Sequence, residues 1–341
     1  MSGEAPILEV KNLRVSYHTY AGEIQAVRGV SFALDKGNIL AVVGESGCGK
    51  SVTAKTIMGL IRKPFGEIKE GSEILYQGEN ILDYNKKQWA RYKGGECAIV
   101  FQDALAALNP TMRVGKQVAE NIILHRHVGK REAWEASVEM LRLVGIPDPE
   151  RQARQYPHEL SGGMRQRVMI AIAFACAPKL LICDEPTTAL DVTIQGQILD
   201  LIKTLRKEKN TSVIMITHDL GVVASIAQEI AVMYSGIIVE QGSCEDIFYT
   251  PRHPYTAALI RAVPGLEAGA GQRLETIPGT PPDLLKPPLG CPFAPRCEYC
   301  MEICREAQPA YTDFGGGHSA ACWLHHEYAP AVDLRTWRGA V

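Results

Sequence analysis

The sequence has no long hydrophobic segment. Its longest uninterrupted apolar run covers residues 168–177, and Pro178 follows directly. That is about half of the roughly 20 residues that a membrane-spanning helix needs, so we interpret the run as a buried core helix. The N-terminus also lacks the basic and apolar stretches of a secretory signal. These absences predict a cytosolic protein, in which cysteines are more often thiols or metal ligands than disulfides.

The sequence likewise has no excess of charge of one sign. Lys and Arg total 36 against 38 Asp and Glu, for a net charge of −2. This balance gives no support for a general polyanion binder, and we expect no nucleic acid partner. The 341 residues contain neither an internal repeat nor a low-complexity tract. A chain of this length is sufficient for two domains.

Proline and cysteine are unevenly distributed. Twelve of the 20 prolines and five of the ten cysteines lie in the last 91 residues. We therefore predict two domains, residues 1–250 and residues 251–341. The second part is a small, irregular Cys-rich domain, because it has little hydrophobic periodicity.

The first 250 residues alternate between strand-like and helix-like segments. The residues from 114 to 144 are mostly helical, and residues 229–242 predict a terminal hairpin with its turn at Gly236. Repeated alternation of strands and helices predicts an α/β core with a largely parallel sheet. The predicted strands are residues 7–10, 27–34, 39–43, 97–101, 180–183 and 213–217.

A glycine-rich segment follows the strand predicted at residues 39–43. Its sequence, Gly-Glu-Ser-Gly-Cys-Gly-Lys-Ser, fits the phosphate-binding pattern G-x-x-x-x-G-K-[ST], and a helix pattern follows it. Backbone N–H groups can surround phosphate oxygens there, at the positive end of a helix. Lys50 would contact the β- and γ-phosphates, and Ser51 would bind Mg²⁺. The predicted nucleotide-binding residues are Gly44, Glu45, Ser46, Gly47, Cys48, Gly49, Lys50, Ser51 and Val52.

Two carboxylates, Asp184 and Glu185, end the apolar strand predicted at residues 180–183. Asp184 can hold Mg²⁺ directly or through water, and Glu185 can polarise an attacking water. So short a motif occurs by chance about as often as it is functional. Together with the phosphate-binding loop, it predicts a Mg²⁺-dependent nucleotide hydrolase.

Residues 160–167, Leu-Ser-Gly-Gly-Met-Arg-Gln-Arg, resemble the signature of the ABC-transporter ATPases. The resemblance extends over about residues 7–250. It implies a P-loop ABC-type ATPase domain with a mixed sheet core and a helical subdomain at about residues 103–175. In that family the signature faces the nucleotide of an opposing ATPase subunit. The resemblance therefore implies a second ATPase subunit, whose bound nucleotide is contacted by Ser161, Gly162 and Gly163 of this chain.

The remaining elements of the family occur in the family's order. Gln102 resembles the Q-loop glutamine, His218 the switch histidine, and Ala189-Leu190-Asp191 the D-loop, in which Asp191 is a nucleotide contact. Tyr17 lies where the family stacks an aromatic ring on adenine, although Tyr20 is close enough to take that role. The resemblance assigns catalysis to Glu185, His218, Lys50 and Gln102, and the Mg²⁺ ligands to Ser51, Gln102 and Asp184.

Four further segments resemble the oligopeptide/dipeptide/nickel importer branch: residues 101–110, 156–160, 253–256 and the tail that begins at residues 290–293. In the first, Ala106 and Ala107 replace residues that are more often Ser and Thr. The branch implies an ATP-hydrolysing translocase subunit that powers peptide import, located peripherally on the cytoplasmic face of the membrane. Its partners would be a homologous ATPase subunit, two membrane permease subunits and, indirectly, a solute-binding protein. A nickel importer and a soluble, non-transport ABC ATPase are the alternatives.

The last five cysteines lie within 32 residues, and only Cys297 and Cys300 form a C-x₂-C pair. Four thiolates suit a [4Fe–4S] cluster or a structural Zn²⁺, and free thiols are a third interpretation. His318, His325 and His326 are alternative ligands. The resemblance favours the cluster, with Cys300 as a spare, because the branch binds one through four cysteines. They correspond to Cys291, Cys297, Cys304 and Cys322. The group would have a structural role in a segment poor in apolar runs.

Overall fold

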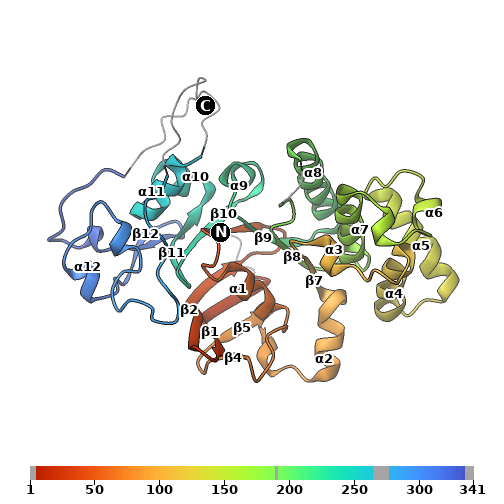
Figure 1. Cartoon of the computed structure of the whole chain (residues 1–341), viewed down its shortest axis with the longest axis horizontal. Coiled ribbons are helices and arrows are strands. Elements are labelled where there is room, and N and C mark those ends of the chain that lie inside the picture. The colour runs from red at the N-terminus through yellow and green to blue at the C-terminus, as the bar shows by residue number, and fades with distance from the viewer. Residues whose placement is uncertain (1–4, 189–190, 264–275, 335–341) are drawn as a thin grey trace. The chain divides into compact units, whose positions relative to one another are not determined.

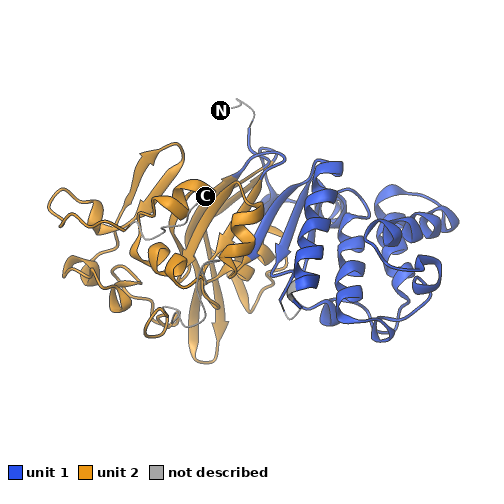
Figure 2. Cartoon of the chain, turned by 90° about the horizontal axis from the view of Figure 1, so that it is seen from above, with its two compact units in different colours: residues 1–7, 34–38, 77–216 blue, residues 8–33, 39–76, 217–341 orange. Residues whose placement is uncertain are grey.

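The computed structural model describes residues 5–188, 191–263 and 276–334. Residues 1–4, which belong to the N-terminus considered above, and Ala189 and Leu190 of the predicted D-loop lie outside the described residues. The chain forms two compact units, and neither is continuous in sequence. Unit 1 contains residues 1–7, 34–38 and 77–216, and unit 2 contains the rest (Figure 2). The predicted boundary near residue 250 stays a prediction.

The first sheet of unit 2 is antiparallel. Its strands are β1 (Leu8–Thr19), β2 (Gly22–Leu34), β4 (Gly66–Ile68) and β5 (Glu73–Tyr76), with both β4 and β5 paired to β1. Buried and more exposed residues alternate along much of β1 and β2, which is typical of strands with one face on the core. This sheet carries Tyr17.

The second set of strands in unit 2 contains the strand that leads into the phosphate-binding loop. That strand, β3 (Ile39–Val43), is buried throughout and pairs in parallel with β10 (Glu229–Tyr234). The predicted hairpin is confirmed, because β10 pairs antiparallel with β11 (Ile237–Ser243). It is not the terminal element, however. Strands β13 (His318–Ala321) and β12 (Tyr311–Gly315) add to the far side of β11.

The helices of unit 2 are short (Figure 1). Tyr234, Tyr255 and Phe293 form an aromatic cluster, with ring centroids 4.5–5.4 Å apart. The described part of the Cys-rich segment therefore packs on the same hydrophobic core as β3 and β10. The helices are α1 (Lys50–Ile57), α9 (Leu220–Ile226), α10 (Cys244–Tyr249), α11 (Pro254–Arg261) and α12 (Ile303–Glu306), with 3₁₀ turns η4 (Ala294–Arg296) and η5 (Trp323–His325).

Unit 1 contains a parallel set of three buried strands, β7 (Cys97–Val100), β8 (Leu180–Asp184) and β9 (Ser212–Thr217), in that order. The strands predicted at these positions are confirmed, since continuous apolar runs suit strands that are covered on both faces. The mostly helical stretch from 114 to 144 is two helices, separated where His127 takes a left-handed φ of 54°.

The helices of unit 1 gather mainly in the region predicted to be a helical subdomain (Figure 1). They are α3 (Ala104–Ala107), α4 (Val114–Arg126), α5 (Lys130–Leu143), α6 (Pro149–Gln152) and α7 (Gly162–Phe174), followed by α8 (Val192–Lys209). Shorter elements are β6 (Glu79–Asn80), η1 (Ile81–Asp83), α2 (Lys86–Arg91), the π turn η2 (Tyr92–Glu96) and η3 (Pro157–Glu159).

Candidate active site

The phosphate-binding loop of unit 2 joins β3 to α1 and depends on glycine. Gly44 and Gly49 have φ of 150° and 106°. A Cβ on Gly44 would lie 2.1 Å from the Met233 carbonyl oxygen, and one on Gly49 would lie 2.4 Å from that of Ala26. Both positions therefore exclude other residues, because a real Cβ does not approach backbone so closely.

Lys50 is buried at the start of α1 and curls back over the loop. Its Nζ donates hydrogen bonds to the carbonyl oxygens of Gly44, at 2.7 Å, and of Glu45, at 2.9 Å. The ammonium group is thus positioned by the loop that it serves. Ser51 and Val52 follow in the first turn, whereas Ser46 and Gly47 are exposed at the tip of the loop.

The carboxylates of unit 1 lie where β8 ends. Asp184 is buried at the last position of the strand, and Glu185 follows with a left-handed φ of 48°. The Oε2 atom of Glu185 accepts hydrogen bonds from Gln102 Nε2, at 3.1 Å, and from Thr188 Oγ1, at 3.0 Å. The structure therefore joins the predicted Gln102 and Glu185. Sequence reasoning missed Thr188, whose only signal is its position three residues after Glu185.

The signature residues begin helix α7 in unit 1. Ser161 is the N-cap, and its Oγ accepts from the backbone N–H of Met164 at 3.4 Å. Ser161 and Gly162 are exposed, which leaves this helix N-terminus accessible to an anionic ligand. One turn later, the buried Gln166 donates from Nε2 to the Pro186 carbonyl oxygen at 2.5 Å, tying the signature helix to the segment after Glu185. Sequence analysis did not single out Gln166.

The other predicted nucleotide contacts are divided between the units. Asp191 occupies the N-cap position of α8 in unit 1. In unit 2, His218 lies at the junction of β9 and α9, and Tyr17 lies on β1 opposite Gly66. Tyr17 is partly buried, which raises the pKa of its hydroxyl, whereas Tyr20 is exposed. The assignments of Asp191, His218 and Tyr17 stay predictions.

A small cavity in unit 2 is lined by the four predicted cysteine ligands, Cys291, Cys297, Cys304 and Cys322. Cys300 is not among the lining residues. Backbone groups near all four sulfurs oppose the rise in thiol pKa: those of Phe293 and Ala294 at Cys291, Tyr299 at Cys297, Met301 at Cys304 and Leu324 at Cys322. Amides aimed at sulfur favour the thiolate, which is the form that ligates metals.

Burial keeps these cysteines protonated in the absence of a cation. It raises the pKa of Cys297 and Cys322 to about 12 and that of Cys291 to about 11. Within the described ranges, no three His, Cys, Asp or Glu residues are arranged to hold a single metal ion. The described part of the chain therefore has no preformed metal site, and metal ligation by these cysteines stays a prediction.

His253 adds an unsatisfied donor to the same cavity. Its Nδ1 accepts from the backbone N–H of Tyr255 at 3.0 Å, so the neutral ring carries its proton on Nε2. Nε2 is buried without a hydrogen-bond partner among the described residues, and His253 lines the cavity. Burial lowers the His253 pKa to about 3, which keeps the ring neutral. A sulfur acceptor in the cavity would satisfy this donor.

The alternative histidine ligands have other partners. His318 Nε2 lies 2.9 Å from Glu240 Oε1, and His325 Nε2 lies 2.7 Å from the Arg252 carbonyl oxygen. Neither these two nor His326 line the cavity. Sequence analysis placed His253 in a branch-specific segment but missed its position beside the cysteines, because only tertiary packing brings them together.

Comparison with known proteins decides the family. A family model described as "ABC transporter" matches residues 27–188, and one described as "Oligopeptide/dipeptide transporter, C-terminal region" matches residues 239–304. The oligopeptide transport ATP-binding protein OppD of Bacillus subtilis is 54% identical over 96% of this chain and 91% of its own length. The chain belongs to the ABC transporter ATP-binding proteins.

Other similar proteins agree with this ABC ATPase assignment. The dipeptide transport ATP-binding protein DppD of Lactococcus lactis is 51% identical over 96% of this chain and 94% of its own. The dimeric cassette MJ0796, solved with ADP and Pi, has a TM-score of 0.62 at 26% identity, covering 70% of this chain and 98% of that one. CbiO1 of Clostridium perfringens has a TM-score of 0.60 at 29% identity, covering 72% and 91%. The predicted family and fold class are confirmed.

Among the described residues of this ABC ATPase, none of the helices combines the length and the apolar character that crossing a bilayer requires. The run at residues 168–177 is the second half of α7 and a few residues beyond it, and most of it is buried. It is the core helix that the sequence predicts.

Proposed function

We propose that this ABC ATPase powers the import of di- and oligopeptides through a membrane transporter. The observation that carries the proposal is similarity from end to end. Relatives named oligopeptide or dipeptide transport ATP-binding proteins are 48–54% identical over at least 93% of this chain. The similarity includes the Cys-rich segment, part of which matches the family model described as "Oligopeptide/dipeptide transporter, C-terminal region".

In the proposed reaction, residues 44–51 bind the phosphates of ATP and Lys50 stabilises charge that develops on the γ-phosphate. Ser51, Gln102 and Asp184 would hold Mg²⁺, which neutralises charge on the β- and γ-phosphates. Glu185 polarises the attacking water. Its carboxylate is oriented for this by the hydrogen bonds from Gln102 and Thr188.

We assign the exposed N-terminus of α7 to a second ATPase subunit. Ser161, Gly162 and Gly163 would complete the nucleotide site of that subunit, and the chain carries only one such segment and one phosphate-binding loop. The MJ0796 cassette is dimeric in its solved structure. Binding of ATP would close the pair and hydrolysis would release it, while Asp191 and His218 contact the nucleotide.

The membrane permease subunits would bind the helical region after Gln102. Leu105 and Leu124 are exposed there, on α3 and α4, and are 51% and 62% accessible. Exposed leucines near a nucleotide-contacting segment are suited to a protein interface. The chain would thus lie peripherally on the cytoplasmic face of the membrane, and a solute-binding protein would act indirectly through the permeases.

We further propose that Cys291, Cys297, Cys304 and Cys322 bind a [4Fe–4S] cluster with a structural role. The shared cavity, the backbone groups that favour the thiolate at all four cysteines and the unsatisfied His253 Nε2–H support this. The thioether-free, all-cysteine donor set suits iron–sulfur chemistry, and zinc is the alternative.

The function is tested with the Glu185→Gln variant in the reconstituted transporter. Glutamine keeps the shape of the side chain but removes its basicity, so ATP binding should persist while hydrolysis and peptide uptake fall about a hundredfold or more. Glu208→Gln, an exposed change on α8, is the matched control and should behave as wild type. Unchanged turnover in Glu185→Gln would refute the proposed role. Uptake of labelled nickel but not of peptide would refute the proposed cargo.

A further inference from the structure

An ion pair within unit 2 links the Cys-rich segment to the phosphate-binding loop. Arg296, at the end of η4 and directly before Cys297, donates from Nη1 to Glu45 Oε2 at 2.6 Å and from Nη2 to Glu45 Oε1 at 2.9 Å. The Arg296 side chain is only 4% exposed and that of Glu45 is 26% exposed. Two parallel bonds between a guanidinium and a carboxylate fix both position and orientation.

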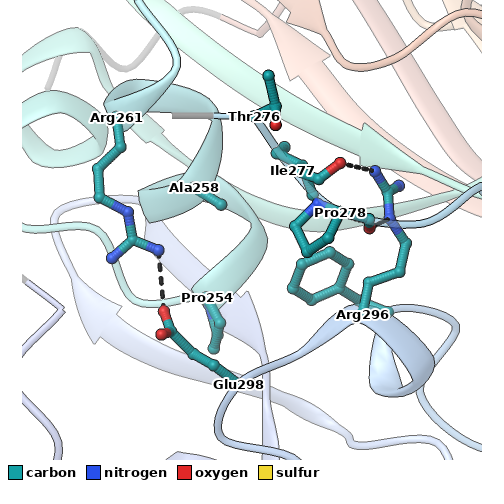
Figure 3. Close-up of a pocket in the computed structure, with 9 residues that line it drawn as sticks. Pro254, Ala258, Arg261, Thr276, Ile277, Pro278, Arg296 and Glu298 are labelled. Carbon is teal, nitrogen blue, oxygen red and sulfur yellow. Dashed lines mark hydrogen bonds and ion pairs between the residues drawn. The ribbon is translucent and has the colours of Figure 1, made fainter. Parts of the chain in front are cut away.

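The Arg296 guanidinium is itself held in place. It extends from η4 to Ile277 and Pro278, and all three residues line a cavity of about 270 Å³ (Figure 3). Its Nε donates to the Pro278 carbonyl oxygen at 2.8 Å, and Nη2 donates to that of Ile277 at 3.2 Å. Nη1 also donates to the Tyr234 hydroxyl at 3.1 Å. A lysine could not reproduce this planar set of bonds.

A second contact reaches the backbone of the same loop residue. The backbone N–H of Glu45 donates to the hydroxyl of Tyr255 at 2.9 Å, and the Tyr255 ring is buried against Tyr234 and Phe293. The C-terminal part of the chain therefore holds both the main chain and the carboxylate of Glu45. The carbonyl oxygen of Glu45, in turn, is one of the two that accept from Lys50 Nζ.

We propose that Arg296 is a positioning residue of the nucleotide site, through which the Cys-rich segment sets the affinity for ATP. This rests on the proposed binding of phosphate by residues 44–51. Arg296 acts in two ways. It fixes Glu45, and with it the loop that positions Lys50, and it neutralises a carboxylate that would otherwise repel an anionic ligand.

The two effects predict different changes in the Kd for ATP in different variants. Arg296→Gln leaves the Glu45 charge unpaired beside the phosphates, so the Kd for ATP should rise about tenfold, within the range of typical coupling between sites. Glu45→Gln removes the charge and should raise Kd less. The double variant restores neutrality, and its Kd should lie well below that of Arg296→Gln. Such recovery is the mark of an interaction between the two residues.

The experiment is a titration of the purified full chain with a fluorescent ATP analogue, accompanied by melting curves without nucleotide. Arg305→Gln is the matched control, because Arg305 is an exposed arginine beside Cys304, as Arg296 is beside Cys297. In the assembled transporter, Arg296→Gln should raise the KM for ATP by the same factor as Kd and leave kcat within about twofold, as for loss of uniform binding.

Four results would each overturn the role of Arg296 or one of its premises. If Arg296→Gln lowers the melting temperature but keeps the wild-type Kd for ATP, Arg296 has only a structural role. A double variant as weak as, or weaker than, Arg296→Gln would remove the role of the ion pair. Should Arg296→Gln fail to fold, wild-type Kd values in both Arg296→Lys and Glu45→Gln would overturn the proposal. Retained ATP binding in Lys50→Ala would instead overturn the phosphate-binding role of the loop.

Discussion

The phosphate-binding loop and the cysteine cavity lie in the same unit but are built in opposite ways. The loop is contiguous, and residues 44–51 supply its glycines, its lysine and its helix N-terminus. The cavity takes its lining from positions as far apart as His253 and Leu324. A contiguous site needs only a strand and a helix to support it. A dispersed site forms only when the whole surrounding segment is folded, so its presence indicates that the segment is folded.

Substitution of Lys50 should have the largest effect and tests how local the loop is. Lys50→Ala removes the ammonium group that the loop positions, so ATP binding and hydrolysis should fall by at least about a hundredfold. Lys55→Ala, an exposed change on the same helix, should leave both unchanged. The measurement is nucleotide binding and turnover together with the melting temperature. Full binding in Lys50→Ala would contradict the assignment of the site.

Substitution of one cavity cysteine should have the next largest effect and tests the dispersed site. Cys304→Ser should abolish retention of iron and labile sulfide and destabilise the segment by several kcal/mol, because binding free energy of a metal group is also folding free energy. Cys300→Ser is the matched control and should retain both. The readouts are elemental analysis, the visible spectrum of anaerobically purified protein and thermal unfolding. Zinc without iron in the wild-type protein would reject the cluster.

The smallest expected effect is a pH dependence from His253. Burial lowers its folded-state pKa to about 3, against an ordinary value near 6.5. The unfolded chain therefore takes up the proton first, and the stability contributed by neutral His253 is complete above pH 6.5 and declines as the pH falls toward 3. Between pH 7 and pH 5 the metal-free chain should lose about 2 kcal/mol from this residue.

The control for this prediction is His253→Asn, in which Oδ1 can replace Nδ1 as the acceptor for the Tyr255 N–H. Comparison of denaturant unfolding at the two pH values should show a smaller loss in the variant than in the wild type, by about 2 kcal/mol. Equal losses would show that His253 takes up no proton on unfolding in this range. Both proteins carry the same surface carboxylates, so the contribution of these groups to the loss of stability cancels when the two losses are subtracted.

The two sites also differ in what the sequence could predict. The strand before the loop is apolar at all of its positions, and its glycine and lysine spacing is local, so both could be predicted. The same is true of β8 with Asp184 and Glu185. Cysteine spacing and resemblance identified the four residues that line the cavity. Periodicity showed nothing of β12 and β13, since these strands are short and β12 is exposed at alternate residues.

Contacts between distant positions could not be predicted. Arg296 and Glu45 are 251 positions apart, and neither residue belongs to a periodic pattern that would indicate a partner. The environment of His253 could not be predicted either. The hydrogen bond to its Nδ1 places the proton on Nε2, and only the folded chain shows that Nε2 lacks an acceptor among the described residues. Thr188 was missed for a simpler reason: a threonine in a turn has no distinctive local signal.

Strand β13 also limits where the chain can be truncated. Its pairing with β11 occupies main-chain groups that would otherwise be exposed along the sheet margin. Glu240 of β11 is fully buried and accepts from the backbone N–H groups of Arg252 and His253, beside His318. A truncation near residue 250 would remove those partners from the Glu240 carboxylate. It would also expose the main-chain groups of β11, which could then pair with another chain. The nucleotide-binding part of this chain should therefore be poorly soluble when it is produced alone.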